Sequence, residues 1–97
     1  KTTLIVRREG DELRRYVHLA TGNYNPETSA VYTDLGLLTD DEEIGEDATE
    51  LFNFLTAYSQ KNDFRRMLVA PINLRERMVK LIRRETFNAK KGLPARI

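Results

Sequence analysis

The sequence contains no cysteine, and its apolar residues never form a long run. Without cysteine the chain has neither a disulfide framework nor a thiolate metal site, which fits a reducing compartment. A membrane-spanning helix needs about 20 consecutive apolar residues, and no segment approaches that length. No signal peptide opens the chain. We therefore expect a cytoplasmic protein without transmembrane segments.

A strong charge of either sign is also lacking, because 16 basic and 15 acidic side chains leave a net charge of +1. With 40% apolar and 32% charged residues, the composition is that of a globular domain and not of a disordered tail. The length of 97 residues fits one small domain. Because the chain starts at Lys1 inside a predicted strand and stops at Ile97 just after a predicted helix, we expect a partial domain whose sheet continues on both sides.

Two segments rich in β-forming residues, 2–7 and 13–19, flank a short loop that contains Gly10 and predict an antiparallel hairpin. Side chains alternate between the two faces of a strand. In the second strand one face carries Leu13, Arg15, Val17 and Leu19, and the other carries Arg14, Tyr16 and His18. The apolar stretch 30–38 predicts a third strand or extended segment that includes Tyr32.

Apolar residues at helical spacing predict an amphipathic helix over residues 40–58. Thr39 and Glu42 have the spacing of a capping box at its start. The acidic run 40–43 suits the positive end of the helix dipole. We therefore interpret that run as structural and predict no metal site in it.

Residues 66–70, apolar from Met67 onward, end at Pro71 and predict a short buried strand. Asn73 is expected to cap a second helix that ends near Gly92. One stripe of that helix carries Leu74, Met78, Leu81, Ile82 and Ala89. The resulting order, β-β-β-α-β-α, predicts an α/β fold with a mixed β-sheet, an N-terminal hairpin and two main helices.

The single histidine, His18, lies just before a turn rich in small and amide residues. In that turn Asn23, Asn25 and the backbone N–H groups around Gly22 can donate hydrogen bonds to anionic oxygens. Imidazole both attacks phosphorus and moves protons near neutral pH. This layout indicates phosphate chemistry, with the chain supplying part of a site.

Four segments resemble consecutive signatures of bacterial polyphosphate kinase. They are Tyr-Val-His-Leu-Ala-Thr-Gly-Asn-Tyr-Asn (16–25), Ala-Val-Tyr-Thr-Asp-Leu-Gly-Leu-Leu-Thr (30–39), Leu-Phe-Asn-Phe-Leu (51–55) and Leu-Val-Ala-Pro-Ile-Asn-Leu-Arg (68–75). The resemblance spans essentially the whole chain and implies a phospholipase D-like fold. It implies that residues 1–97 are one partial domain, within the first of two such C-terminal catalytic domains. Ala20 departs from the pattern, since the family usually has glycine there.

The resemblance implies reversible transfer of the terminal phosphate of ATP to inorganic polyphosphate through a phosphohistidine. It matches Lys1 to the lysine of a His-x-Lys motif whose histidine is the nucleophile. His18 matches a second functional histidine, as a proton donor or a structural support, and Tyr32 matches a tyrosine that contacts the nucleotide. Asn23 and Asn25 are phosphate-binding candidates. Because the nucleophile is not in this sequence, the isolated fragment is expected to be inactive.

The same resemblance implies ATP, ADP and polyphosphate as ligands. It implies Mg²⁺ held by residues outside this fragment, and no metal ligand within it. The remaining domains of the parent enzyme are the expected partners, and the parent is expected to form a homo-oligomer. Association of the parent with a membrane is compatible with the family but is not indicated by these residues.

From the residues alone, bland alternatives stay open. Without the resemblance His18 would be interpreted as a structural or exposed strand residue and Tyr32 as part of a core, whereas Asn23 and Asn25 are equally turn formers. The recurring arginine pairs suit polyphosphate or nucleic acid, so a small basic nucleic-acid-binding module is the alternative function. No zinc-finger or helix-turn-helix signature and no aromatic stacking platform supports it. The favoured interpretation has no nucleic-acid partner.

Overall fold

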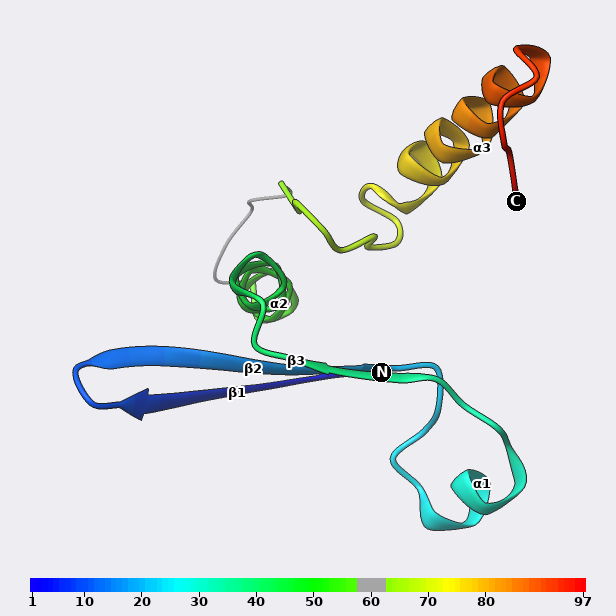
Figure 1. Ribbon diagram of the computed structural model, residues 1–97. Coiled ribbons are helices and arrows are strands. Elements are labelled where there is room, and N and C mark those ends of the chain that lie inside the picture. The colour runs from blue at the N-terminus through cyan, green and yellow to red at the C-terminus, as the bar shows by residue number, and fades with distance from the viewer. Residues whose placement is uncertain (58–62) are drawn as a thin grey trace. The chain divides into compact units, whose positions relative to one another are not determined.

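The computed structural model describes residues 1–57 and 63–97. These residues form two compact units, 1–67 and 68–97. The elements, in chain order, are β1 (Thr2–Glu9), β2 (Glu12–Ala20), α1 (Pro26–Val31), β3 (Gly36–Thr39), α2 (Glu42–Leu55) and α3 (Leu74–Lys90) (Figure 1). The predicted α/β class, N-terminal hairpin and two main helices are confirmed. That residues 1–97 form one partial domain stays a prediction.

Strands β1 and β2 form the expected antiparallel hairpin, with Thr2 opposite Leu19 and Glu9 opposite Glu12. Gly10 has a φ of 63° in the turn, a conformation that glycine adopts at little cost. Strand β3 pairs antiparallel with the other edge of β2, so the sheet order is β1-β2-β3. We expected a mixed sheet, whereas both pairings among the described strands are antiparallel.

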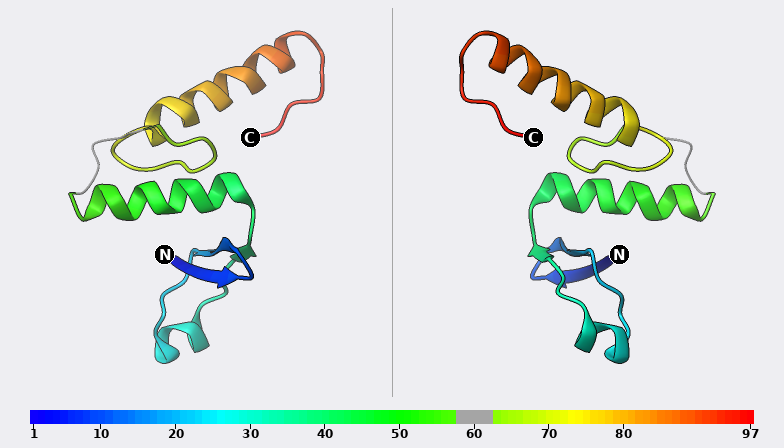
Figure 2. Two further views of the ribbon diagram at one scale, coloured as in Figure 1. Left: turned by 90° about the vertical axis from the view of Figure 1, so that its left-hand side faces the viewer. Right: turned by 90° about the vertical axis from the view of Figure 1, so that its right-hand side faces the viewer.

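Helix α2 covers one face of this sheet (Figures 1 and 2). Val17 on β2 and Ala48 on α2 are both 0% exposed, and the helix and the strand that carry them are in contact. An ideal Cβ at Gly45 would lie 3.0 Å from Cβ of Arg15, so glycine permits the close approach of helix and strand. The predicted alternation of β2 is thereby confirmed, with Val17 and Arg15 on the face toward α2.

The predicted start of α2 is wrong by two residues, and the predicted capping box does not form. Thr39 is the last residue of β3, where its hydroxyl accepts a hydrogen bond from Asp41 N (3.0 Å). Asp41 is the N-cap instead, and its carboxylate accepts from Ile44 N (2.9 Å). The helix ends at Leu55, and the predicted end at Tyr58 lies outside the described residues.

The predicted strand over residues 30–38 is wrong for most of its length. Residues 26–31 form α1, because Asn25 caps the helix and Pro26 occupies its first turn, where a missing N–H costs nothing. Strand β3 starts only at Gly36. Tyr32 is therefore the C-cap of α1 and is 68% exposed, so it lies neither in a strand nor in a core.

The predicted strand over residues 66–70 is also wrong. Its first backbone donors are satisfied by a side chain, since Asp47 accepts from the N–H groups of Arg66 (2.6 Å) and Met67 (2.8 Å) and from that of the preceding Arg65 (2.9 Å). Asp47 is 2% exposed. A buried carboxylate needs such donors, and a segment bonded in this way needs no neighbouring strand.

In the second unit, α3 confirms the predicted second helix. Asn73 occupies the N-cap position, but its side-chain oxygen accepts from Val69 N (2.6 Å) and does not cap the backbone of the helix. Gly92, with a φ of 69°, follows the helix end as expected. No described residue of α3 is buried within the chain.

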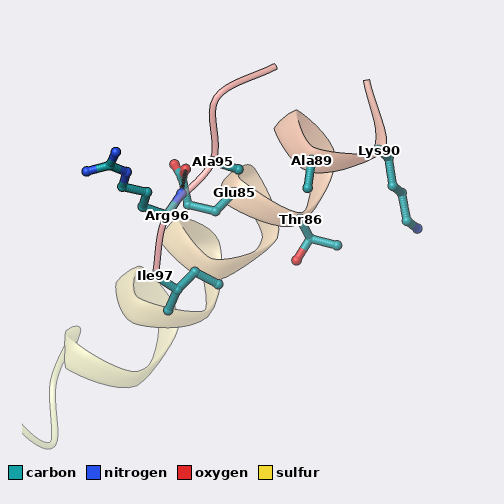
Figure 3. Close-up of a pocket in the computed structure, with 7 residues that line it drawn as sticks. All are labelled: Glu85, Thr86, Ala89, Lys90, Ala95, Arg96 and Ile97. Carbon is teal, nitrogen blue, oxygen red and sulfur yellow. Dashed lines mark hydrogen bonds between the residues drawn. The ribbon is translucent and has the colours of Figure 1, made fainter. Parts of the chain in front are cut away.

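The tail after α3 folds back along the helix (Figure 3). Arg96 N donates to Glu85 Oε2 (3.2 Å), and Arg84 Nε donates to Glu85 Oε1 (2.9 Å). The bond from Arg84, and then that from the Arg96 amide, lower the pKa of Glu85. Among the described helices, none has the length and apolarity needed to cross a membrane.

Replacing Asp47 tests how the segment after α2 is held. Asp47→Asn keeps one acceptor oxygen but turns an N–H₂ group toward backbone donors. We expect the free energy of unfolding to fall by about 1–3 kcal/mol, the cost of buried donors without an acceptor. Urea denaturation of the 97-residue chain, followed by circular dichroism, measures this change.

Glu46→Gln is the matched control for this substitution. Glu46 precedes Asp47 on the same helix and forms an exposed ion pair with Arg65 Nη1 (2.9 Å). Exposed pairs contribute about 1 kcal/mol or less, so the control should change the unfolding free energy little. Equal losses in the two variants would contradict a special role for the buried carboxylate.

Candidate functional site

The face of the sheet opposite α2 carries two of the predicted site residues. Directly opposed residues of an antiparallel pair share a face, and Thr3 lies opposite His18. Lys1 continues the register, since Ala20 N donates to Lys1 O (2.9 Å) and the main-chain N of Lys1 donates to Ala20 O (2.6 Å). Gly36 of β3 lies opposite Ala20. We call this set, Lys1, Thr3, His18, Ala20 and Gly36, the His18 face.

The loop between β2 and β3 is closed at its base. Thr21 N donates to Leu35 O (3.0 Å), and Leu35 N donates to Thr21 Oγ1 (3.1 Å). The Thr21 hydroxyl donates in turn to Asp34 Oδ1 (3.0 Å). An ideal Cβ at Gly22 would lie only 2.5 Å from Asp34 Oδ2, so a side chain at this position would displace the Asp34 carboxylate. We call these contacts the loop neck.

A pocket of about 200 Å³ lies inside this loop. It is lined by Thr21, Gly22, Asn23, Thr28, Tyr32 and Asp34. Two predicted site residues, Asn23 and Tyr32, are thus brought together. The pocket offers an amide, hydroxyl groups and an aromatic ring, the kinds of group that bind a phosphate or a nucleoside.

Thr28 and Asp34 line the pocket but were not predicted to do so. Asp34 follows Tyr32 in the Tyr-Thr-Asp motif, so the sequence did carry a signal for it. Thr28 reaches the pocket because α1 forms, and the expectation of an extended segment concealed that helix.

Asn25 lies outside the pocket lining. Its side-chain oxygen caps α1 by accepting from Glu27 N (2.9 Å) and Thr28 N (3.1 Å). The turn-forming role that the residues alone allowed is therefore present in the structure. A contact of Asn25 with phosphate stays a prediction.

His18 makes its side-chain contacts with a loop residue that the sequence did not single out. Its Nδ1 lies 2.7 Å from the Tyr24 hydroxyl, and that hydroxyl accepts from Thr3 Oγ1 at 2.9 Å. The two rings are 5.6 Å apart and tilted by 40°. His18 does not line the pocket with Asn23 and Tyr32, but Tyr24 connects it to the same loop.

Several of the arginines that are adjacent in the sequence have their positive charge neutralised by nearby carboxylates. Arg14 lies 3.9 Å from Glu9 and 3.5 Å from Asp40. A hydrogen bond with Tyr16, and then the charges around it, raise the pKa of Arg14. On the other face of the sheet, α2 and the segment after it supply further pairs: Arg65 with Glu46 and Arg66 with Glu43. These pairs weaken the case for a bare basic surface that binds nucleic acid.

Comparison with known proteins gives the family. The family described as polyphosphate kinase C-terminal domain 1 matches residues 1–61. The chain belongs to the polyphosphate kinase family. A polyphosphate kinase from Synechocystis sp. is 57% identical over 97 residues, which are 100% of this chain and 13% of the relative. A second from Streptomyces coelicolor is 48% identical with the same coverage of 100% and 13%.

A solved structure supports the same assignment. The crystal structure of polyphosphate kinase from Porphyromonas gingivalis matches with a TM-score of 0.83 and 36% identity, over 95% of this chain and 14% of that chain. The family resemblance stated from the sequence is therefore confirmed. The chain spans about 13% of the length of the curated relatives described above, so the activity of the whole enzyme is a matter for proposal.

The loop neck predicts a specific effect of Gly22→Ala. The new methyl group would meet the Asp34 carboxylate at 2.5 Å and force the neck apart. We expect the amides of Thr21 and Leu35 to exchange with solvent about tenfold faster or more, because local opening becomes easier. Amide hydrogen exchange followed by NMR measures both sites.

Asn23→Ala serves as the control, since it alters the same loop and pocket without adding an atom toward Asp34. Protection of Thr21 and Leu35 should remain at the wild-type level in that variant. If Gly22→Ala also retains wild-type protection, the neck does not depend on the glycine.

Proposed function

We propose that this chain is part of a polyphosphate kinase that reversibly transfers the terminal phosphate of ATP to inorganic polyphosphate through a phosphohistidine. The observation that carries the proposal is the loop pocket, in which Asn23 and Tyr32 line one cavity. Identity of 57% to a polyphosphate kinase along the whole chain supports it. On this proposal residues 1–97 are part of the first phospholipase D-like catalytic domain.

The pocket residues bind ATP in this proposal. The exposed Tyr32 ring offers a stacking surface to adenine or its hydroxyl to a phosphate. Asn23 donates its amide N–H₂ group to phosphoryl oxygens. Asn25 can do the same, because its helix cap uses the side-chain oxygen alone.

On the His18 face, Lys1 supplies positive charge and His18 supplies a proton. Lys1 holds phosphate oxygens through its ammonium charge, which offsets the negative charge of the transferred group. His18 acts as a catalytic proton donor to the ADP oxygen that leaves when the phosphoryl group is transferred, and it regains the proton when the reaction reverses or the site is reset. The nucleophile is a different histidine, because the single histidine of this sequence matches the second one of the family.

The reaction proceeds in two balanced transfers. An imidazole nitrogen of the parent enzyme attacks the terminal phosphorus of ATP, and the bond to the ADP oxygen breaks. The terminal oxygen of polyphosphate then attacks the phosphohistidine, which restores the histidine and lengthens the chain by one phosphate. Preorganised donors stabilise the charge on the transferred group in both steps.

Mg²⁺ and the partners lie beyond this chain. Within residues 1–57 and 63–97 no three acidic or histidine side chains come together as a metal site. The family resemblance is what supports assigning Mg²⁺, which neutralises phosphate charge when bound, to ligands elsewhere in the parent. The parent binds ATP, ADP and polyphosphate, includes further domains, forms a homo-oligomer and acts in the cytoplasm.

Kinetics of a chimera separate the two parts of the site. In the chimera this chain replaces the matching 97 residues of the Synechocystis sp. enzyme. We expect Tyr32→Ala to raise the KM for ATP about tenfold with little change in kcat, since it removes a binding contact. His18→Ala should lower kcat roughly 100-fold, the scale of a lost proton donor. Steady-state polyphosphate synthesis provides both constants.

Val31→Ala is the matched control for Tyr32→Ala. Val31 is the preceding residue, is also exposed and does not line the pocket. Its constants should equal those of the chimera. An unchanged KM for ATP in Tyr32→Ala would contradict the nucleotide role of the tyrosine.

The isolated 97-residue chain should synthesise no polyphosphate from ATP, because it lacks the nucleophilic histidine. The assay pairs the isolated chain with the active chimera at equal molar concentration, with ATP and Mg²⁺ present. Polyphosphate formed by the isolated chain, and lost in its His18→Ala variant, would show that His18 itself carries the phosphate.

A further inference from the structure

We infer that Tyr24 is a positioning residue, whose hydroxyl accepts from Thr3 and donates to Nδ1 of His18 so that Nε2 carries the imidazole proton. The inference rests on the proposed proton-donor role of His18 and deepens it. It names the nitrogen that holds the proton and the residue that keeps it there.

The direction of the hydrogen bond from Thr3 carries the inference. Thr3 Oγ1 donates to the Tyr24 hydroxyl at 2.9 Å, so the hydrogen of the Tyr24 hydroxyl is left for a different acceptor. Nδ1 of His18 lies 2.7 Å from that hydroxyl. A neutral imidazole that accepts at Nδ1 carries its hydrogen at Nε2. The two hydrogen bonds that connect Thr3, Tyr24 and His18, which we call the relay, thus favour the imidazole tautomer with its hydrogen at Nε2.

Strand β3 leaves room beside Nε2. An ideal Cβ at Gly36 would lie 3.1 Å from Nε2 of His18, which is shorter than most contacts that Cβ atoms make in proteins. A side chain at this position would press on the ring, whereas glycine leaves the nitrogen accessible. The chemical class that fits beside a protonated nitrogen on this face is a phosphate oxygen.

The tyrosine is itself held by the loop. Tyr24 lies between Asn23, which lines the pocket, and Asn25, which caps α1. Its ring is 60% exposed and packs against the imidazole at 5.6 Å. Its hydroxyl therefore adds orientation to His18, and its removal leaves no large cavity in the core.

NMR of the 97-residue chain tests the relay directly, because the sequence has one histidine. Long-range ¹H–¹⁵N correlation at alkaline pH, where imidazoles are neutral, reports which nitrogen of His18 is protonated. The Nε2–H tautomer should predominate. In Tyr24→Phe the ratio of Nε2–H to Nδ1–H should fall about fivefold, the effect of one ordinary hydrogen bond.

Two further variants show whether a change in the tautomer ratio comes from this hydrogen-bonded chain. Thr3→Val removes the donor to Tyr24 and should change the ratio in the same direction by a smaller factor. Tyr32→Phe removes a hydroxyl elsewhere in the loop and should leave the ratio unchanged. The backbone ¹H–¹⁵N spectrum of each variant shows whether the hairpin stays folded.

Activity of the chimera connects the relay to catalysis. Tyr24→Phe should lower kcat about tenfold with an unchanged KM for ATP, because a misplaced proton donor loses part of its roughly 100-fold effect. Added to His18→Ala, the same substitution should have no further effect, since both act through one group.

The outcomes separate the inference from the proposal on which it rests. If His18→Ala leaves kcat unchanged, the proton-donor role of His18 is wrong, whatever the tautomer ratio. If His18→Ala lowers kcat but Tyr24→Phe leaves either the tautomer ratio or kcat at the wild-type value, the positioning role of Tyr24 is overturned. If Tyr24→Phe lowers both the tautomer ratio and kcat, and has no further effect on kcat when it is added to His18→Ala, the positioning role of Tyr24 is supported.

Discussion

The alternation of side chains along β2 determines where everything else in the first unit lies. Val17 is fully buried under α2, so its neighbour His18 must point to the opposite face. Pairing on both edges of β2 fixes the register, and a slip of one residue would exchange the two faces. Burial of one valine therefore specifies the orientation of the imidazole, and the core and the site share one constraint.

The loop between β2 and β3 adds chemistry to this frame while remaining attached to it. Its neck is closed by Thr21 and Asp34, whose hydroxyl and carboxylate bond across the two strand ends. Tyr24 provides a second attachment through His18. A loop held at two points loses less conformational freedom when it binds a ligand, which favours binding.

The regular elements followed from the sequence where periodicity and local signals agreed. The hairpin and both long helices were predicted because their apolar spacing and the glycines Gly10 and Gly92 point the same way. The prediction failed at α1, although Asn25 and Pro26 form a standard helix start. The prediction gave more weight to the apolar residues from position 30 onward, which favour a strand, than to this helix start. A six-residue helix offers too few turns for periodicity to correct the error.

The remaining errors share one physical cause, which is that hydrogen bonds between residues distant in sequence leave no local pattern. Residues 66–70 have the composition of a strand, yet Asp47, 19 positions before Arg66, accepts their first amides. Tyr24 escaped notice in the same way, because its role depends on the register that brings Thr3 beside His18. The family resemblance supplied Tyr32 and His18 as single residues. Their connection through Tyr24 emerges only when strand and loop are placed in space.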